Sequence, residues 1–350
     1  MRAAPKHKRL RPAAWLGLAA LLFAALPARA QDDTAAFYKG KTLQVIIGYS
    51  VGGGYDEYAR VLARYMERHI PGNPTIVPQN MPGAGSLRAV NYLYNIAPKD
   101  GTVFATFARG EAMEPLFNRG ATQFDARKLT WLGSITNEVS VCVFRADSGI
   151  KSWEDMQKKP FTVAGTGSGS DTDVFPNVLR NMFDLPLKLV TGYPGGSDVV
   201  LAVERGEVNG RCGWSWSSLM SRNKAMYENK EINVTVQLAL QKHEDLPNVP
   251  LIMDLARNPT EKAALKLIFA RQSMARPFAA PPNIPAERKK ALRDAFDATM
   301  KDPDFLEEAK RSDMEVRPES GAAVEALVNE IYASPPEVIE LAAKSIQDAK

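Results

Sequence analysis

The most regular alternation of apolar and polar positions lies between residues 43 and 69. An apolar run over residues 43–49 is typical of a buried parallel strand, and glycines at residues 52–54 interrupt it. Apolar side chains then return at the spacing of one helical face, at Tyr58, Val61, Leu62, Tyr65 and Met66. The pattern predicts a strand, a glycine loop and a helix. The free N–H groups of the first helical turn would attract an anion; the alternative is a simple turn.

The same order of strand, glycine loop and helix recurs further along the chain. Glycine loops stand at residues 81–86, 165–170 and 193–197, after strands expected at residues 75–77, 161–164 and 188–190. Repeated units of this kind predict parallel sheets with crossover helices, and therefore an α/β fold. Several glycine loops at strand ends favour a bound anion over incidental turns.

Further strands are expected at residues 102–107, 140–144 and 207–212. From about residue 234 the pattern becomes helix-rich. It predicts helices at residues 286–300 and 322–332 and a proline-punctuated connection at residues 277–285. This last third of the chain contains no candidate chemistry, so we expect it to pack against and cover the sheets.

The first thirty residues have the pattern of a secretory signal peptide. Basic residues are concentrated in residues 1–11, residues 13–26 are apolar and uncharged, and small residues stand at Ala28 and Ala30. The apolar run is shorter than the roughly 20 residues that a membrane-spanning helix needs. We therefore expect cleavage after Ala30 and export of a soluble protein.

Removing this segment changes the charge balance. Residues 1–30 hold six of the 44 Lys and Arg residues and none of the 40 Asp and Glu residues, which leaves 38 basic against 40 acidic residues. No basic stripe remains, so a nucleic-acid partner is not expected. An anion site would have to come from local geometry.

Cysteine and histidine are scarce in the predicted mature chain. Cys142 and Cys212 can form one disulfide in an oxidising compartment or remain two buried thiols. His69 and His243 fit no metal-binding or nucleophile motif, so we expect no metal, no cofactor and no catalytic residue.

Several polar residues are candidates for ligand contacts. Arg109 follows the strand at residues 102–107, where α/β sheets bind ligands, and its alternative role is an ion pair with Glu111 or Glu114. Asp56 either caps the helix after the first glycine loop or contacts the ligand. Trp214 and Trp216, two apart on an expected strand, either pack in the core or line a pocket.

The glycine loops, in their order, resemble those of the substrate-binding proteins of tripartite tricarboxylate transporters, the Bordetella uptake gene receptors. Residues 51–56 (VGGGYD) stand for a PGGxxD loop, residues 79–85 (QNMPGAG) for ENRPGAG, and residues 169–173 (GSDTD) for GSxxH. Residues 193–196 (YPGG) and 204–208 (ERGEV) match two further segments. Val51, Met81 and Asp173 depart from the family pattern, so the far end of the ligand is expected to differ.

The resemblance implies a two-lobed periplasmic binding protein of the Venus flytrap type, each lobe a sheet flanked by helices. We expect lobe 1 at residues 31–137 and 240–350 and lobe 2 at residues 138–239. Backbone N–H groups, without fixed positive charge, would hold an organic di- or tricarboxylate between the lobes. The resemblance implies these ligand-binding residues: Ser50, Val51, Gly53, Asp56, Thr166, Gly167, Ser168, Gly169 and Ser170. Arg109 is a further candidate because of its position after a strand.

Three functions fit these expectations. The first is a monomeric receptor that delivers a carboxylate to membrane permease subunits. The second is an exported sensor whose loaded form contacts a membrane histidine kinase, with the same fold and pocket. The third, an exported enzyme acting on a carboxylate, lacks a base near Ser50 or Ser170.

Overall fold

The structure is a computed structural model that describes residues 1, 4, 33–117 and 121–348. The predicted signal peptide and its cleavage site lie outside these residues, apart from two isolated positions. Within the described part of the chain, no helix is long and apolar enough to cross a membrane.

The first sheet has six strands in the order β11-β4-β10-β3-β1-β2. Its parallel half contains β1 (Thr42–Ile47), β2 (Thr75–Asn80) and β3 (Val103–Thr106). Its antiparallel half contains β10 (Pro277–Ala280), β4 (Thr130–Ser134) and β11 (Glu319–Ser320). The connection predicted at residues 277–285 was wrong in its first part, because β10 is a fully buried strand in the middle of this sheet. Pro277 is tolerated as the first residue of the strand.

The second sheet has five strands in the order β7-β6-β8-β5-β9. These are β5 (Ser140–Arg145), β6 (Phe161–Ala164), β7 (Leu187–Val190), β8 (Gly210–Ser215) and β9 (Ile232–Leu238). β6 runs parallel to β7 and β8, whereas β5 is antiparallel to both of its neighbours. β9 corrects the expectation of a helix-rich region from residue 234, since its β-branched residues continue as a strand to Leu238.

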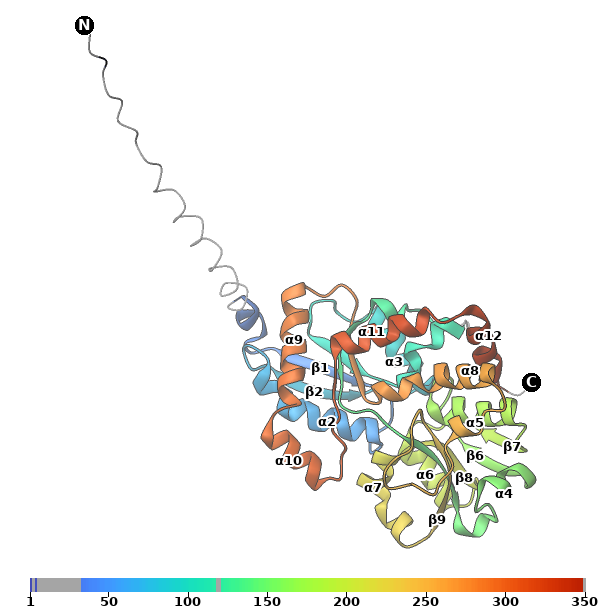
Figure 1. The fold of residues 1–350 in the computed structure, drawn as a ribbon. Helices are drawn as coiled ribbons and strands as arrows, with labels where there is room; N and C mark the ends of the chain where they lie inside the picture. Colours follow the sequence, from blue (N-terminus) through green and yellow to red (C-terminus); the bar gives the residue numbers. More distant parts are fainter. Residues whose placement is uncertain (2–3, 5–32, 118–120, 349–350) are drawn as a thin grey trace.

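Helices cover both sheets (Figure 1). Those that pack on the first sheet include α2 (Gly54–Met66), α3 (Leu87–Asn95), α9 (Ala286–Thr299) and α11 (Gly321–Tyr332), with α10 (Pro303–Arg311) against α2. The second sheet is accompanied by α4 (Trp153–Lys158), α5 (Asp171–Phe183), α6 (Gly196–Glu204) and α7 (Trp216–Glu228). α12 (Pro336–Ser345) packs on both α8 (Pro259–Phe269) and α5. The predicted α/β fold class, with two sheets flanked by helices, is confirmed.

Two features of the second sheet resolve open alternatives. Cys142 and Cys212 lie opposite each other on β5 and β8 and form a disulfide. Trp214 lies on β8, but Trp216 is the first residue of α7. The prediction that the two tryptophans share a strand was therefore wrong. Both indoles are buried in an apolar cluster with Val141.

The chain passes between the two sheets at residues 135–139 and again after β9. The predicted lobe boundaries near residues 137 and 240 fall close to these crossings. They stay a prediction, since a boundary between lobes is defined by how the lobes move.

Candidate functional site

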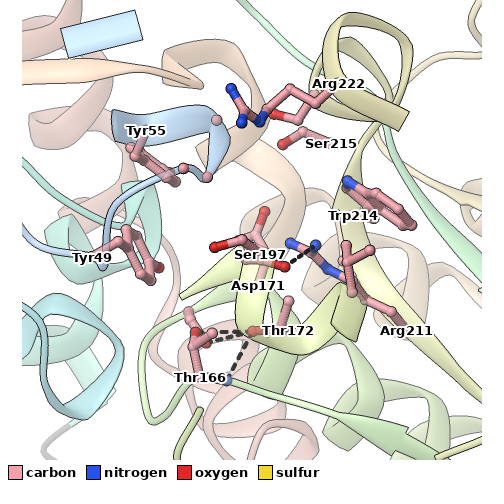
Figure 2. Close-up of a pocket in the computed structure, with 18 of the residues that line it drawn as sticks. Tyr49, Tyr55, Thr166, Asp171, Thr172, Ser197, Arg211, Trp214, Ser215 and Arg222 are labelled. Carbon is pink, nitrogen blue, oxygen red and sulfur yellow. Dashed lines mark hydrogen bonds between the residues drawn. The ribbon is translucent and has the colours of Figure 1, made fainter. Parts of the chain in front are cut away.

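A cavity of roughly 300 Å³ lies between elements of the two sheets (Figure 2). From the first sheet it receives the glycine loop between β1 and α2, with Tyr49 and Tyr55 on either side of that loop. From the second sheet it receives the first turns of α5 and α6, the end of β8 and part of α7. The cavity therefore lies at the carboxyl ends of parallel strands, where open α/β sheets bind ligands.

The N-termini of α2 and α6 meet at this cavity. Gly53 is the N-cap of the 13-residue helix α2, and Gly195 is the N-cap of the nine-residue helix α6. A Cβ atom on Gly53 would lie only 3.5 Å from the backbone nitrogen of Gly196. Because neither cap uses a side chain, the first N–H groups of both helices point their partial positive charge at the same region.

Asp56 holds the first glycine loop by hydrogen bonds and lies outside the cavity lining. Its carboxylate accepts hydrogen bonds from the Gly52 backbone (3.0 Å), from Arg60 Nε (2.9 Å) and from Asn80 Nδ2 (2.9 Å). Burial opposes its ionised form, but these three donors together hold the pKa of Asp56 below its usual value. Asp56 thus acts on the shape of the loop, and it does not line the cavity.

Four arginines line the cavity: Arg109, Arg211, Arg222 and Arg276. Fixed positive charge thus lines the cavity beside the glycine loops, and the expected binding by backbone N–H groups stays a prediction. Arg109 reaches across from the first sheet to Asp171 on α5, with its Nε 2.6 Å from the carboxylate. It pairs with neither of the two glutamates that the sequence suggested. Burial opposes the charge of this guanidinium, but the Asp171 carboxylate raises its pKa above the usual value.

Arg276 forms the second buried positive group. Its Nη2 donates to Ser218 Oγ (2.7 Å) and lies 3.5 Å from the Glu138 carboxylate. The guanidinium also faces the rings of Tyr55 and Tyr58, each at 4.9 Å. These contacts hold it in place through cation–π attraction.

Aromatic rings give the cavity an apolar wall. Tyr49 and Tyr55 stack with ring centroids 5.0 Å apart, and Figure 2 shows them opposite Trp214. The Tyr55 hydroxyl accepts a hydrogen bond from the Arg109 backbone (3.1 Å). Burial raises the pKa of both phenols, so both are neutral at ordinary pH. The site therefore combines positive polar ends with flat apolar surface.

Comparison with known proteins places this architecture in a family. Residues 58–342 match the model of the tripartite tricarboxylate transporter family receptor. The chain belongs to this receptor family. A UPF0065 protein of Cupriavidus necator is 25% identical over 307 residues, which is 85% of either chain.

Solved structures share the fold of this receptor at low sequence identity. The periplasmic binding protein BugD superposes with a TM-score of 0.72 and 18% identity, covering 88% of this chain and 98% of BugD. MatC of Rhodopseudomonas palustris, solved with malate, superposes with a TM-score of 0.68 and 17% identity, covering 88% of this chain and 99% of MatC. A second R. palustris protein, solved with adipate, superposes with a TM-score of 0.68 and 16% identity, covering 87% of this chain and 97% of that protein.

Four of the residues expected to bind ligand in this receptor line the cavity: Gly53, Arg109, Thr166 and Ser170. Ser50 and Val51 instead lie where the first loop meets the fourth. Ser50 Oγ donates to Asp198 (2.6 Å), and the Val51 carbonyl accepts from Ser197 Oγ (3.1 Å). These contacts join elements of the two sheets at the edge of the cavity.

Of the other three predicted residues, Gly167 and Ser168 face the second glycine loop, whereas Gly169 does not. Gly167 and Ser168 line a separate open cavity with Gly83 and Ala84, and Gly169 lies against Glu111. The Gly167 backbone donates to Asp173 (2.8 Å), so Asp173 supports its loop much as Asp56 does. The third loop is thus divided between the cavity and a contact with the first sheet.

Sequence reasoning missed five charged residues that line the cavity: Asp171, Glu204, Arg211, Arg222 and Arg276. Arg211 had a usable signal, since a basic residue stands inside an otherwise uncharged stretch, residues 208–216. Arg276 and Asp171 had none, because their positions depend on long-range pairing.

Proposed function

We propose that this chain is a periplasmic receptor that binds an organic di- or tricarboxylate in the cavity and delivers it to the membrane permease subunits of a tripartite tricarboxylate transporter. The observation that carries the proposal is the convergence of two helix N-termini and four arginines on a cavity with two lining carboxylates, Asp171 and Glu204. Such a site favours anions.

The similar proteins support this ligand class. Malate and adipate, present in two of the similar structures, are both dicarboxylates. They differ in length and polarity, so the family fold accommodates more than one acid. We infer for this chain the class and leave the individual acid to experiment.

Ligand contacts are assigned by position. Gly53, Thr166 and Ser170 would contact the acid directly, and Arg109 would contribute its charge from the wall. Ser50, Val51, Asp56, Gly167, Ser168 and Gly169 would act by fixing the loops and their contacts across the cavity. The acid would be released unchanged, by reopening of the cleft between two lobes.

The positions of the histidines support binding without turnover. His69 Nε2 lies 2.6 Å from Asp302, and His243 Nε2 lies 2.9 Å from Glu315. Neither ring lines the cavity. A general base for the cavity serines would have to come from another group. We therefore propose a receptor rather than an enzyme. We also propose that it is exported by its signal peptide and is a monomer.

A thermal-shift screen of residues 31–350 tests the ligand class. The panel contains succinate, malate, adipate, citrate, benzoate, aspartate and phosphate. An acid at about 100 times its dissociation constant stabilises the folded state by about 2.7 kcal/mol. We expect a shift from one carboxylate class, with the acid recovered unchanged by NMR. Gly53→Asp, which places a negative charge between the two helix N-termini and so repels an anionic ligand, should abolish the shift. A shift from phosphate alone, or consumption of the acid, would contradict the proposal.

A further inference from the structure

Arg211 is a buried arginine without an acidic partner. It is 9% exposed and projects from β8 into the cavity. Among the described residues, no carboxylate oxygen lies within 4.0 Å of its nitrogens. One nitrogen, Nη1, donates to the Gly196 carbonyl (3.1 Å), and the guanidinium stands 4.8 Å from the centre of the Trp214 ring. Nε is buried without a hydrogen-bond partner. The positive charge is therefore desolvated and not neutralised.

The other three arginines of the cavity differ in this respect. Arg109 pairs with Asp171, Arg276 lies 3.5 Å from Glu138, and Arg222 lies 3.5 Å from Glu57. Each has an acid of the protein beside it. An anionic ligand would have to compete with those acids for three of the guanidinium groups, but not for the fourth.

The burial of Arg211 also affects its pKa. Burial lowers the pKa of Arg211 to about 9, since the protein provides little that stabilises its charged form. A desolvated charge is unfavourable unless it is paired. An anion in the cavity would supply the missing partner, and its binding would then be strongly favoured.

The guanidinium also lies beside the helix N-termini. A Cβ atom on Gly196, the first residue of α6, would be 3.2 Å from Arg211 Nη2. Gly196 is in turn the residue that approaches Gly53 at the start of α2. In Figure 2 the guanidinium points toward the side of the cavity that holds Tyr49 and Tyr55. Two independent features, a free cation and two helix ends, thus converge on one place.

We propose that Arg211 binds a carboxylate of the ligand directly and makes the receptor selective for the ionised acid over its neutral analogues. This inference rests on the proposed function and refines it. Nη2 is the donor that faces the ligand, because Nη1 is held by Gly196. Trp214 lies against the guanidinium and restricts its movement. The amide of an acid, which has the same shape without the charge, would leave the guanidinium unpaired.

Calorimetric titration with malate, adipate, succinate and citrate tests the role of Arg211. Arg211→Met should weaken binding of the acid that binds wild-type protein by about 100-fold or more, because one partner of a desolvated ion pair is lost. Arg211→Lys keeps the positive charge but loses the paired N–H donors of the guanidinium. Its affinity for the acid should lie between those of wild-type protein and Arg211→Met. The diamide of the same acid should bind wild-type protein about as weakly as the acid binds Arg211→Met. Arg205→Gln is the control, since the Arg205 side chain is 68% exposed and its only ion pair among the described residues is with Glu207, at 3.9 Å.

The unfolding temperature without ligand separates binding from folding. Arg211→Met should unfold at the same temperature as wild-type protein or higher, because it removes an unpaired buried charge. Equal affinity of wild-type protein and Arg211→Met for the acid would overturn this inference and leave the proposed function standing. Unfolding of Arg211→Met well below the wild-type temperature would also overturn it, as it would make Arg211 a structural residue. If wild-type protein binds none of the four acids, the proposed function fails and the inference fails with it.

Discussion

Asp302 fixes the end of α2 that lies opposite the cavity. Its carboxylate contacts Arg68 (Nε at 2.7 Å) and His69 (2.6 Å), just beyond the end of α2. It also caps α10 by accepting from the backbone nitrogen of Asp304 (3.0 Å). The hydrogen bonds from Arg68 and His69 hold the pKa of Asp302 well below its usual value. One side chain therefore positions the helix whose other end forms the candidate site.

This shift sets the direction of a pH effect on stability. A carboxyl group with a lowered pKa in the folded state stabilises the protein above the pKa of the unfolded chain, about 3.9. That stabilisation is lost as the pH falls through this value toward the lowered one. Asp302→Asn should therefore cost about 1 to 2 kcal/mol at pH 7, and the difference from wild-type protein should shrink at pH 3.

Urea unfolding at pH 7 and at pH 3 measures both differences. Asp304→Asn is the matched control, because its carboxylate is 65% exposed and also contacts Arg68, at 2.9 Å. An exposed pair of this kind contributes little. A constant difference between Asp302→Asn and wild-type protein at the two pH values would contradict the assignment.

For single residues, the sequence predicted positions along the backbone better than it predicted which charged side chains pair. Gly53 and Thr166 were named through the family resemblance, which rests on glycine loops that follow recognisable strands, and Arg109 was named because a strand end fixes where a residue lies. The partner of Arg109 was not predicted. Asp171 is 62 residues away from it in the chain, and only the folded structure brings them together. Side-chain pairs across two sheets leave no local pattern.

The β5–β8 pair is the element that carries Arg211, and a disulfide crosses it. Cys142 and Cys212 are directly paired and 70 residues apart in the chain. Closing a loop of that length in the unfolded chain should stabilise the folded protein by about 4 kcal/mol. We expect Cys142→Ala with Cys212→Ala to lose a stability of this order.

Denaturant unfolding with and without a reductant tests the disulfide. Reduced wild-type protein should match the double alanine variant, and the variant should gain nothing from oxidising conditions. Because both cysteines are buried and neither lines the cavity, the folded variant should keep its affinity for the acid. Equal stability of oxidised and reduced wild-type protein would show that the bond contributes nothing.

Elements were predictable where the pattern was local. The strand–loop–helix units of β1, β2, β6 and β7 were found, since each combines an apolar run, a glycine loop and a helical face. β9 and β10 were missed, because neither is followed by a glycine loop, and β10 returns to the first sheet only after the whole second sheet. A short apolar run such as residues 277–280 has no periodicity that separates strand from helix or connection.

Loop contacts join the two sheets beside the cavity, and no strand of the described residues belongs to both sheets. The Gly85 backbone, after β2, donates to the Thr166 carbonyl, after β6 (3.1 Å). On the other side of the cavity, Ser50 and Val51 contact Asp198 and Ser197. These contacts surround the candidate site, so they would break if the lobes opened to admit or release a ligand.

Gly85 allows a direct test of this closure. Its φ of +65° favours glycine, and a Cβ atom there would lie 2.6 Å from the Gly167 carbonyl oxygen. Gly85→Ala should therefore keep the third loop away from the second and oppose closure. We expect affinity for the acid to fall about tenfold or more, since the closed state would be less populated. Small-angle scattering should show less compaction of the variant on addition of the acid.

Gly149→Ala separates this effect from simple backbone strain. Gly149 has a similar φ of +78°, but nothing lies within 4 Å of a Cβ atom at that position. Both variants should lose about 1 kcal/mol of stability, because alanine tolerates a positive φ poorly. Only Gly85→Ala should also lose affinity and compaction. If the two variants bind the acid equally well, the contact between the second and third loops plays no part in closure, and the lobes must close through the contacts of Ser50 and Val51.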